Sequence, residues 1–293
     1  MTEAQFILAH NTTVTKNASL EEELAAAKKA GYKALELHAS KLINYLNAGN
    51  SIGQLKTKLL EFELVGLGFL QDFERPEEEV LLSEARNLFE LAKQCGFPAV
   101  QILSGPLDVN QVIRFCSGDD KVQYAELLQK DISSAIDFAS NRLKKLSLLA
   151  EEYGIILYIE ALGWTQLNKI EYQIEAIKKS QVSNIKLIVD FWHCYVAGNT
   201  PADIAEIDKE LIYGVHICDS LEKVNEPPIE SQLRNVITGE GVLNLIDWVN
   251  AIKETGYNLW WASETFSESD YACEPELSAR KHYELVNKLL HLY

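Results

Sequence analysis

The chain has 293 residues, of which 47% are hydrophobic and 24% are charged, and its formal net charge is −16. This length and composition are typical of a soluble globular protein with a full-sized hydrophobic core. The negative charge disfavours binding to nucleic acid and to anionic membrane surfaces, because both attract clusters of Lys and Arg. We therefore expect the partners to be a cation and a small polar molecule.

The five cysteines are scattered, odd in number and without CxxC spacing. This usage is typical of a reducing compartment rather than of a disulfide framework. The opening segment MTEAQFILAH has no basic stretch followed by a long apolar one, so we expect no signal peptide. Apolar runs all fall short of the roughly 20 residues of a membrane span. The sequence predicts a cytoplasmic protein.

Short apolar runs and amphipathic stretches alternate through the first half of the chain. A helix is expected to begin after Ser19, where Glu22 completes a capping box, and to end at Gly31. The predicted strands of this half are residues 6–9, 34–37, 64–70 and 99–103, and the predicted helices are residues 19–30, 51–63 and 76–95.

The second half continues the alternation. Its predicted strands are residues 155–160, 186–190, 213–218 and 259–263. Its predicted helices are residues 121–153, 166–180, 201–208, 243–254 and 276–290, with a polar loop at residues 219–240. Eight strands alternating with helical segments predict an α/β fold, a (β/α)8 TIM barrel, with residues 1–293 as a single domain. A doubly wound sheet is disfavoured, because the turn after its first strand is usually glycine-rich and here reads AHNTTVTKN.

The last four strands each end in a residue that can bind a metal. IILYIE ends in Glu160, KLIVD in Asp190 and LWWASE in Glu264, while YGVHIC contains His216. In a barrel these four ends open onto one face, which carries the active site. Three carboxylates and one imidazole suit one divalent metal ion, Mn2+, Mg2+ or Co2+, and also Zn2+. The alternative is that a backbone group or an arginine satisfies each side chain separately.

Several short motifs in the same order resemble the sugar isomerase/epimerase superfamily, whose members have xylose-isomerase-like barrels. These members include ketose 3-epimerases, hydroxypyruvate isomerase and inosose dehydratase or isomerase. The matching pieces are YIEALGW, the DxxH of VDFWHCYVAGNT, the HxxD of GVHICDS, and RNVITGEGVLNL ahead of GYNLWWASE. The resemblance follows the strand order over nearly the whole chain.

The resemblance implies a role for each matching residue. It implies that Glu160, Asp190, His216 and Glu264 bind one divalent metal, and that Glu160 and Glu264 also act as the catalytic acid/base pair. It further implies that His193 and Arg234 contact the substrate. Glu222 stands where the ketose 3-epimerases carry an arginine, and Thr238 replaces a frequent proline. We therefore expect the loop at residues 221–233 to set the choice of substrate.

Four further residues are candidates for substrate contact. His10 and His38 end the first two strands, where each either contacts a polar substrate or caps a loop. Trp164 either forms an apolar wall against the carbon face of a sugar or covers the barrel. Glu240 either bonds to a ligand or forms a salt bridge with Arg234. Asp219 is expected to orient His216 or a loop.

The expected reaction is removal of a proton from a carbon beside a metal-bound carbonyl, which needs a base and a group that stabilises the enediolate oxygen. Return of the proton gives isomerisation or epimerisation of a sugar or polyol ketone. Loss of a β-hydroxyl instead gives dehydration, as for an inosose or a dehydroshikimate-type substrate. A catalytically inactive, sugar-binding barrel is a third alternative. The scarcity of Lys and Arg near the rim favours an unphosphorylated substrate, and the sequence leaves a homodimer open.

Overall fold

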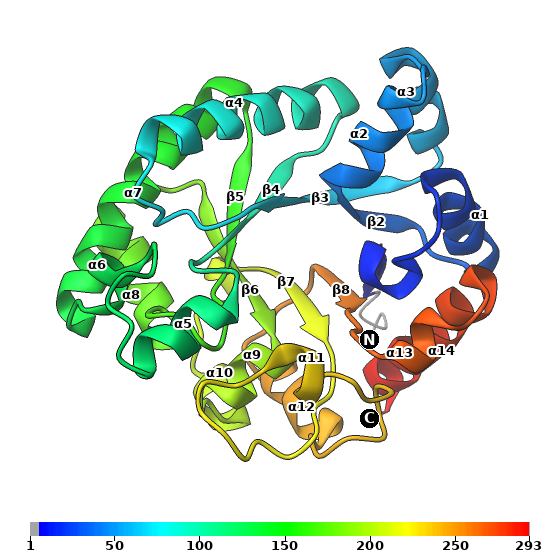
Figure 1. Cartoon of the computed structure of the whole chain (residues 1–293). Coiled ribbons are helices and arrows are strands. Elements are labelled where there is room, and N and C mark those ends of the chain that lie inside the picture. Colours follow the sequence, from blue (N-terminus) through cyan, green and yellow to red (C-terminus); the bar gives the residue numbers. More distant parts are fainter. Residues whose placement is uncertain (1–5, 293) are drawn as a thin grey trace.

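Eight parallel strands close into a barrel in the computed structural model, which describes residues 6–292 (Figure 1). Each strand pairs with the next one along the chain, and β8 pairs with β1. The strands are β1 Ile7–Asn11, β2 Ala34–His38, β3 Glu63–Leu70, β4 Ala99–Leu103, β5 Ile156–Glu160, β6 Ile185–Asp190, β7 Ile212–Ile217 and β8 Trp260–Ser263. The predicted (β/α)8 barrel is confirmed.

Helices surround the barrel on its outer side (Figure 1). The longer ones are α1 Leu20–Ala30, α2 Ala39–Asn47, α3 Ile52–Leu59, α4 Glu78–Cys95, α5 Val109–Cys116, α7 Ile132–Tyr153, α8 Ile170–Ser180, α12 Leu245–Glu254 and α14 Pro275–His291. The short ones are α6 Ala125–Leu128, α9 Phe191–Val196, α10 Pro201–Ala205, α11 Glu230–Leu233 and α13 Glu268–Tyr271, with 3-10 turns η1 Thr12–Thr15 and η2 Lys209–Leu211.

Local capping residues explain where the helices begin and end. The hydroxyl of Ser19 accepts from the backbone N–H of Glu22, whose carboxylate accepts from the N–H of Ser19, and Gly31 ends α1 in the left-handed conformation. The helix predicted at residues 121–153 is too long. Asp131 caps the true helix α7 by accepting from the N–H of Ser134, so residues before it form the separate short helix α6.

Small and large side chains alternate inside the barrel. Four alanines face the interior and leave room for larger rings: Ala9, Ala34, Ala99 and Ala262. The rings of Tyr158, Tyr213 and Trp260 fill this space, with Tyr158 stacked on Tyr213 at a centroid distance of 5.1 Å. Position 214 is a glycine because there is no room for a side chain: a Cβ there would lie 2.1 Å from the ring of Trp260. The interior is therefore a packed layer on which polar side chains at the strand ends rest.

The register of the strands places the polar ends side by side. Asp190 pairs with His216, and His216 pairs with Ala262, two residues before Glu264. Leu103 pairs with Glu160 on the other side. The ends of β5 to β8 therefore lie at one level of the same rim.

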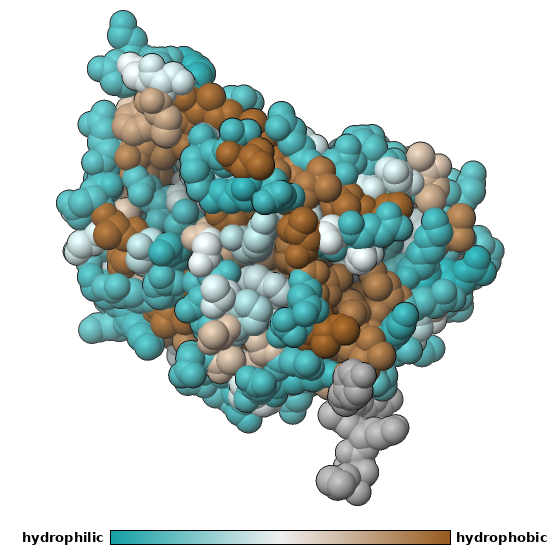
Figure 2. Space-filling view, turned by 90° about the horizontal axis from the view of Figure 1, so that it is seen from below, coloured by the Kyte–Doolittle hydropathy of each residue, from teal (hydrophilic) through white to brown (hydrophobic). Residues whose placement is uncertain are grey.

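The space-filling view from below shows hydrophilic residues over most of that face, with apolar residues gathered in a band across it (Figure 2). Between residues 6 and 292, every helix is too short or too polar to cross a membrane.

Candidate metal centre and active site

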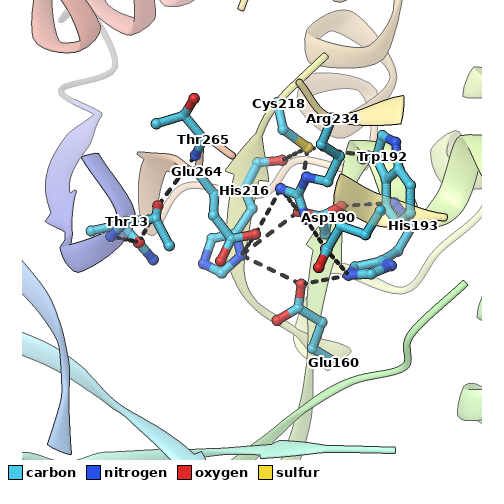
Figure 3. Close-up of polar contacts among 12 residues, drawn as sticks. Thr13, Glu160, Asp190, Trp192, His193, His216, Cys218, Arg234, Glu264 and Thr265 are labelled. Carbon is cyan, nitrogen blue, oxygen red and sulfur yellow. Dashed lines mark hydrogen bonds and ion pairs between the residues drawn. The ribbon is translucent and has the colours of Figure 1, made fainter. Parts of the chain in front are cut away.

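Glu160, Asp190, His216 and Glu264 converge at the carboxyl end of the barrel. One ligand atom from each lies within 4.8 Å of the others. Nδ1 of His216 lies 3.6 Å from Oε2 of Glu264, 3.8 Å from Oε1 of Glu160 and 3.9 Å from Oδ2 of Asp190 (Figure 3). All four side chains are buried. The structure thus brings the four predicted residues together.

The protonation of His216 follows from its contacts. Its Nε2 lies 2.8 Å from Oε2 of Glu36, and because a carboxylate only accepts, Nε2 carries the hydrogen. Nδ1 is buried and has no hydrogen-bond partner among the residues that the structure describes. A buried imidazole nitrogen that faces three carboxylate oxygens fits a cation ligand. The histidine and carboxylates therefore fit a divalent metal ion.

The charges at this end of the barrel also favour a cation. Burial, and then the charge of Glu264, raises the pKa of Glu160. Burial alone would lower the pKa of His216, but Glu36 and Glu264 hold it well above its ordinary value. Three carboxylates against the single guanidinium of Arg234 leave an excess of negative charge. The cluster therefore attracts positive charge, either protons or a divalent cation.

Arg234 occupies the middle of this cluster. Its Nη2 donates to Oε2 of Glu264 at 2.8 Å and to Oδ2 of Asp190 at 3.2 Å, while Nη1 donates to Oε1 of Glu230 at 3.0 Å. Its guanidinium lies over the ring of Phe266 at 4.4 Å. The arginine therefore satisfies part of two predicted ligands, as the alternative to metal binding supposes. It leaves Nδ1 of His216 without a hydrogen-bond partner in the described part of the chain.

Asp190 is held from three sides. One oxygen accepts from the backbone N–H of His193 at 2.7 Å and caps helix α9. The other accepts from the thiol of Cys218 at 3.3 Å and from Arg234. Cys218 is buried, and its thiol contacts a candidate ligand. These contacts fix the direction of the Asp190 carboxylate.

His193 is a neutral hydrogen-bond donor. Its Nδ1 accepts from the backbone N–H of Gly163 at 3.0 Å, and burial lowers its pKa to about 3. The hydrogen of the neutral ring is therefore on Nε2. That nitrogen lies 3.5 Å from Oε1 of Glu160 and 3.9 Å from Oε1 of Glu230. It is placed to donate to an oxygen between these two carboxylates.

A cavity of about 210 Å³ opens directly above the cluster. Its polar lining is Thr12, Thr13, Lys16, His38, Gln101, Glu160, His193, Glu230, Arg234 and Glu264, and its apolar and aromatic lining is Phe69, Leu103, Leu107, Leu162, Phe266 and Tyr271. A concave site with convergent polar groups and an apolar wall is typical of small-molecule binding.

Comparison with known families agrees with this arrangement. Residues 24–289 match the family described as xylose isomerase-like TIM barrel. The chain belongs to this family. The resemblance seen in the sequence motifs is confirmed at the level of the family and its fold.

Relatives of this xylose isomerase-like barrel differ in their reactions. An inosose isomerase of Bacillus velezensis is 22% identical over 97% of this chain and 96% of its own length. A 3-dehydroshikimate dehydratase of Pseudomonas aeruginosa is 23% identical over 91% of this chain, which spans 39% of that protein.

Solved structures share the fold of this barrel. The IOLI protein with a bound zinc atom has a TM-score of 0.85 and 20% identity, over 98% of this chain and 99% of that one. An L-ribulose 3-epimerase has a TM-score of 0.71 and 16% identity, over 98% of this chain and 95% of that one.

Two predicted substrate contacts of the barrel do not reach the cavity. His10 points outward to helix α1, because strand alternation sends Ala9 and not His10 into the barrel. Its Nε2 lies 3.0 Å from Oγ1 of Thr15 and 3.5 Å from Glu23. Trp164 donates from Nε1 to the carbonyl of Pro106 at 2.8 Å and packs behind His193. It covers the barrel and forms no wall of the cavity.

The Gly-Glu-Gly turn also differs from the prediction. Glu240 is exposed and makes no ion pair with Arg234, whose carboxylate partners in the described part of the chain are Asp190, Glu230 and Glu264. The nearby carboxylate of Asp219 accepts from the backbone N–H groups of Gly239, Gly241 and Leu243. Asp219 therefore orients this loop, which was one of its two expected roles.

Three site residues escaped sequence reasoning. Glu36 bonds to His216, Gln101 donates to Oε2 of Glu160, and Glu230 lines the cavity. A signal existed for the first two, because each is a polar residue inside a short apolar strand, ALELH and AVQIL. Glu230 lies in the polar loop expected to set substrate choice. Many other residues of this loop are also polar, so nothing distinguishes it from them.

Proposed function

We propose that the chain is a divalent-metal-dependent isomerase or epimerase of a sugar or polyol ketone, with Glu160 and Glu264 as its proton-transfer pair. The observation that carries the proposal is Nδ1 of His216, which faces Glu160, Asp190 and Glu264 without a hydrogen-bond partner in the described residues. The inosose isomerase, which is similar along nearly its whole length, supports the same class of reaction.

The chain's own residues supply proton transfer and orientation. Glu160 ends β5 and Glu264 follows β8, so their carboxylates approach the cavity from different strands. A hydrogen bond orients each carboxylate: Gln101 donates to Glu160, and Arg234 donates to Glu264. One carboxylate removes a carbon-bound proton and the other returns one. A divalent cation, when bound by the four residues, supplies Lewis-acid polarisation of the substrate carbonyl.

His193 adds a donor for an oxygen of the substrate. Its Nε2–H faces the cavity beside Glu160. Because the ring is neutral, it acts as a hydrogen-bond donor rather than as an acid. A preorganised donor of this kind stabilises negative charge as it develops on oxygen. His38 lines the same cavity and is the second histidine available to a polar substrate.

The lining favours an uncharged substrate. Glu160, Glu230 and Glu264 bring carboxylates to the cavity, while both arms of Arg234 already bond to carboxylates. Lys16 is the other cation of the lining, and its Nζ lies 4.6 Å over the ring of Tyr271. A phosphate or carboxylate would meet repulsion here. We therefore favour a neutral polyol ketone, whose carbon face packs on the leucines of the lining.

A metal-dependent dehydratase is the second candidate. The dehydratase of Pseudomonas aeruginosa supports it, and the initial proton removal is the same. A dehydroshikimate-type substrate carries a carboxylate, however, and Lys16 is the single cation of the lining that does not already bond to a carboxylate. The charge of the cavity therefore ranks this reaction below isomerisation or epimerisation.

The test combines metal analysis with solvent exchange. The purified protein is stripped with EDTA, reloaded with Mn2+, Mg2+, Co2+ or Zn2+, and incubated in 2H2O with inososes, ketoses and 3-dehydroshikimate. We expect about one equivalent of bound metal and metal-dependent deuterium incorporation into a neutral ketone. Water loss from 3-dehydroshikimate would favour the dehydratase. Sugar binding without any exchange would favour the inactive barrel, and failure to bind metal would contradict the proposal.

A further inference from the structure

A charged side chain lies inside the barrel behind the candidate metal centre. Glu36, in the middle of β2, is 1% exposed. Its oxygens accept from Nδ2 of Asn11 at 2.7 Å, from the hydroxyl of Tyr158 at 2.9 Å and from Nε2 of His216 at 2.8 Å. A buried carboxylate is strongly disfavoured without such donors. Its three partners therefore explain how the interior tolerates it.

Glu36 decides which nitrogen of His216 is free. With a hydrogen on Nε2, the ring donates to Glu36 and turns Nδ1 toward the three carboxylates of the cluster, where a bound cation takes the place of a second proton. In the other tautomer, a lone pair would face the Glu36 carboxylate at 2.8 Å. The nitrogen lone pair and the carboxylate oxygen would repel each other, and Glu36 would lose a hydrogen-bond donor. The contact thus selects the tautomer that binds a cation.

We propose that Glu36 is a positioning residue that holds the tautomer and ring direction of His216 for cation binding, and that Tyr158 in turn holds Glu36. The inference rests on the metal centre of the proposed function. A carboxylate that accepts from the outer nitrogen of a ligating histidine raises the basicity of the ligand and fixes its ring.

Packing below Glu36 keeps Tyr158 in place. Its ring stacks on Tyr213 and meets the edge of Trp260. On the opposite side, a Cβ at Gly66 would lie 2.2 Å from the hydroxyl oxygen of Tyr158. A residue without a side chain at position 66 therefore leaves the space through which the phenol reaches Glu36.

The interior offers a matched pair of tyrosines for a test. The hydroxyl of Tyr158 donates to Glu36, whereas the hydroxyl of the adjacent Tyr213 donates to the carbonyl of Val65 at 2.7 Å. Tyr158→Phe and Tyr213→Phe each delete one hydrogen bond in the same aromatic layer. Only Tyr158→Phe removes a hydrogen bond to Glu36, the residue that holds His216. A general loss of stability therefore affects both variants, while a loss of positioning affects one.

The experiment measures metal affinity rather than turnover. Metal-free wild type, Glu36→Gln, Tyr158→Phe and Tyr213→Phe are titrated with Zn2+ and with Mn2+ by calorimetry, after circular dichroism has verified folding. We expect Glu36→Gln to weaken binding about 10- to 100-fold. Tyr158→Phe should weaken it by a smaller factor, and Tyr213→Phe should bind as the wild type does.

Nitrogen-15 NMR of the histidine side chains in the metal-free proteins, at a pH where His216 is neutral, gives a second readout. We expect the Nε2–H tautomer for His216 in the wild type and a mixture of tautomers in Glu36→Gln, because an amide also presents N–H groups to the ring. Wild-type affinity in both Glu36→Gln and Tyr158→Phe would overturn the inference and leave the metal centre intact. Absence of metal binding by the wild type would overturn the proposed function as well.

Discussion

Nη2 of Arg234 donates to Oε2 of Glu264 at 2.8 Å, and the same carboxylate oxygen lies 3.6 Å from Nδ1 of His216. The guanidinium is fully buried and also donates to Asp190. One positive charge therefore orients two candidate ligands while it offsets part of the negative charge that surrounds them. Both effects bear on stability as well as on the site.

Removal of this guanidinium should destabilise the fold. Arg234→Met leaves Asp190 and Glu264 buried without their partner, so we expect a loss of about 3–5 kcal/mol in the free energy of unfolding. Arg114→Met is the control, because its ion pair with Asp119 is exposed and its loss should lower the free energy of unfolding far less. Urea denaturation of both variants measures the difference. Equal losses would contradict the buried ion-pair cluster.

Divalent cations should partly rescue the same variant. In Arg234→Met the cluster retains its carboxylates and lacks its guanidinium, so a bound cation offsets more charge than in the wild type. We expect Mn2+ to raise the melting temperature of Arg234→Met by more than that of the wild type. Thermal melts with EDTA and with Mn2+ test this, and equal shifts would argue against metal binding at the cluster.

Either glutamate of the proposed pair should be essential. Glu160→Gln and Glu264→Gln keep the size of the side chain but remove the group that accepts a proton, so each should lower the exchange rate at least about 10²- to 10⁴-fold. Glu240→Gln is a control on an exposed loop residue outside the cavity. Deuterium incorporation measured by mass spectrometry provides the readout. Wild-type exchange in either cavity variant would rule out a two-carboxylate mechanism.

His193 should act through its Nε2–H. We expect His193→Ala to lower turnover about 10²- to 10³-fold, as for other preorganised donors, with metal affinity unchanged. Gly163→Ala offers a milder version. A Cβ there would lie 2.3 Å from Cγ2 of Val196, so either Val196 or the backbone N–H that holds the histidine ring must move. We expect a smaller loss of turnover, and an unchanged rate in both variants would contradict the assigned role.

Glu74 should make stability depend on pH. It is buried, accepts from the N–H of Gly105 at 2.8 Å, and has its pKa raised by burial from 4.5 to about 8. Between these two pH values the unfolded chain is ionised and the folded chain is protonated at this residue. Stability should therefore fall as the pH rises through this window, with a slope of at most about 1.4 kcal/mol per pH unit.

Glu74→Gln should remove this contribution, since the amide stays neutral and its oxygen still accepts from Gly105. Urea denaturation at several pH values between 5 and 8 compares the variant with the wild type and with Glu240→Gln. An unchanged slope in Glu74→Gln would show that Glu74 is already ionised in the folded protein.

Local sequence signals predicted the barrel and the convergence of four polar side chains at its rim. The ends of α1 follow from contacts within a few residues, made by Ser19, Glu22 and Gly31. The polar residue at the end of each of the last four strands is likewise visible in the sequence of that strand. In a parallel barrel all strand ends share one rim. The convergence of Glu160, Asp190, His216 and Glu264 could therefore be predicted before any contact between them was known.

Other features depend on pairs of residues far apart in the chain. The partner of His216 is Glu36, 180 positions earlier, and the partner of Glu160 is Gln101, 59 positions earlier. Whether His10 reaches the cavity depends on which side of β1 faces helix α1. Trp164 stays outside the cavity, where its ring nitrogen donates a hydrogen bond to the carbonyl of Pro106. No local pattern carries that information.

Strand length, strand polarity and chain order predict the barrel, its rim and the four residues that meet there, because a closed parallel sheet converts these local properties directly into position. Contacts in the folded protein are needed to assign the tautomer of His216, the exposed position of Glu240 and the place of Glu230 in the cavity lining. These depend on side-chain directions and on the few ångströms that separate a hydrogen bond from a near miss.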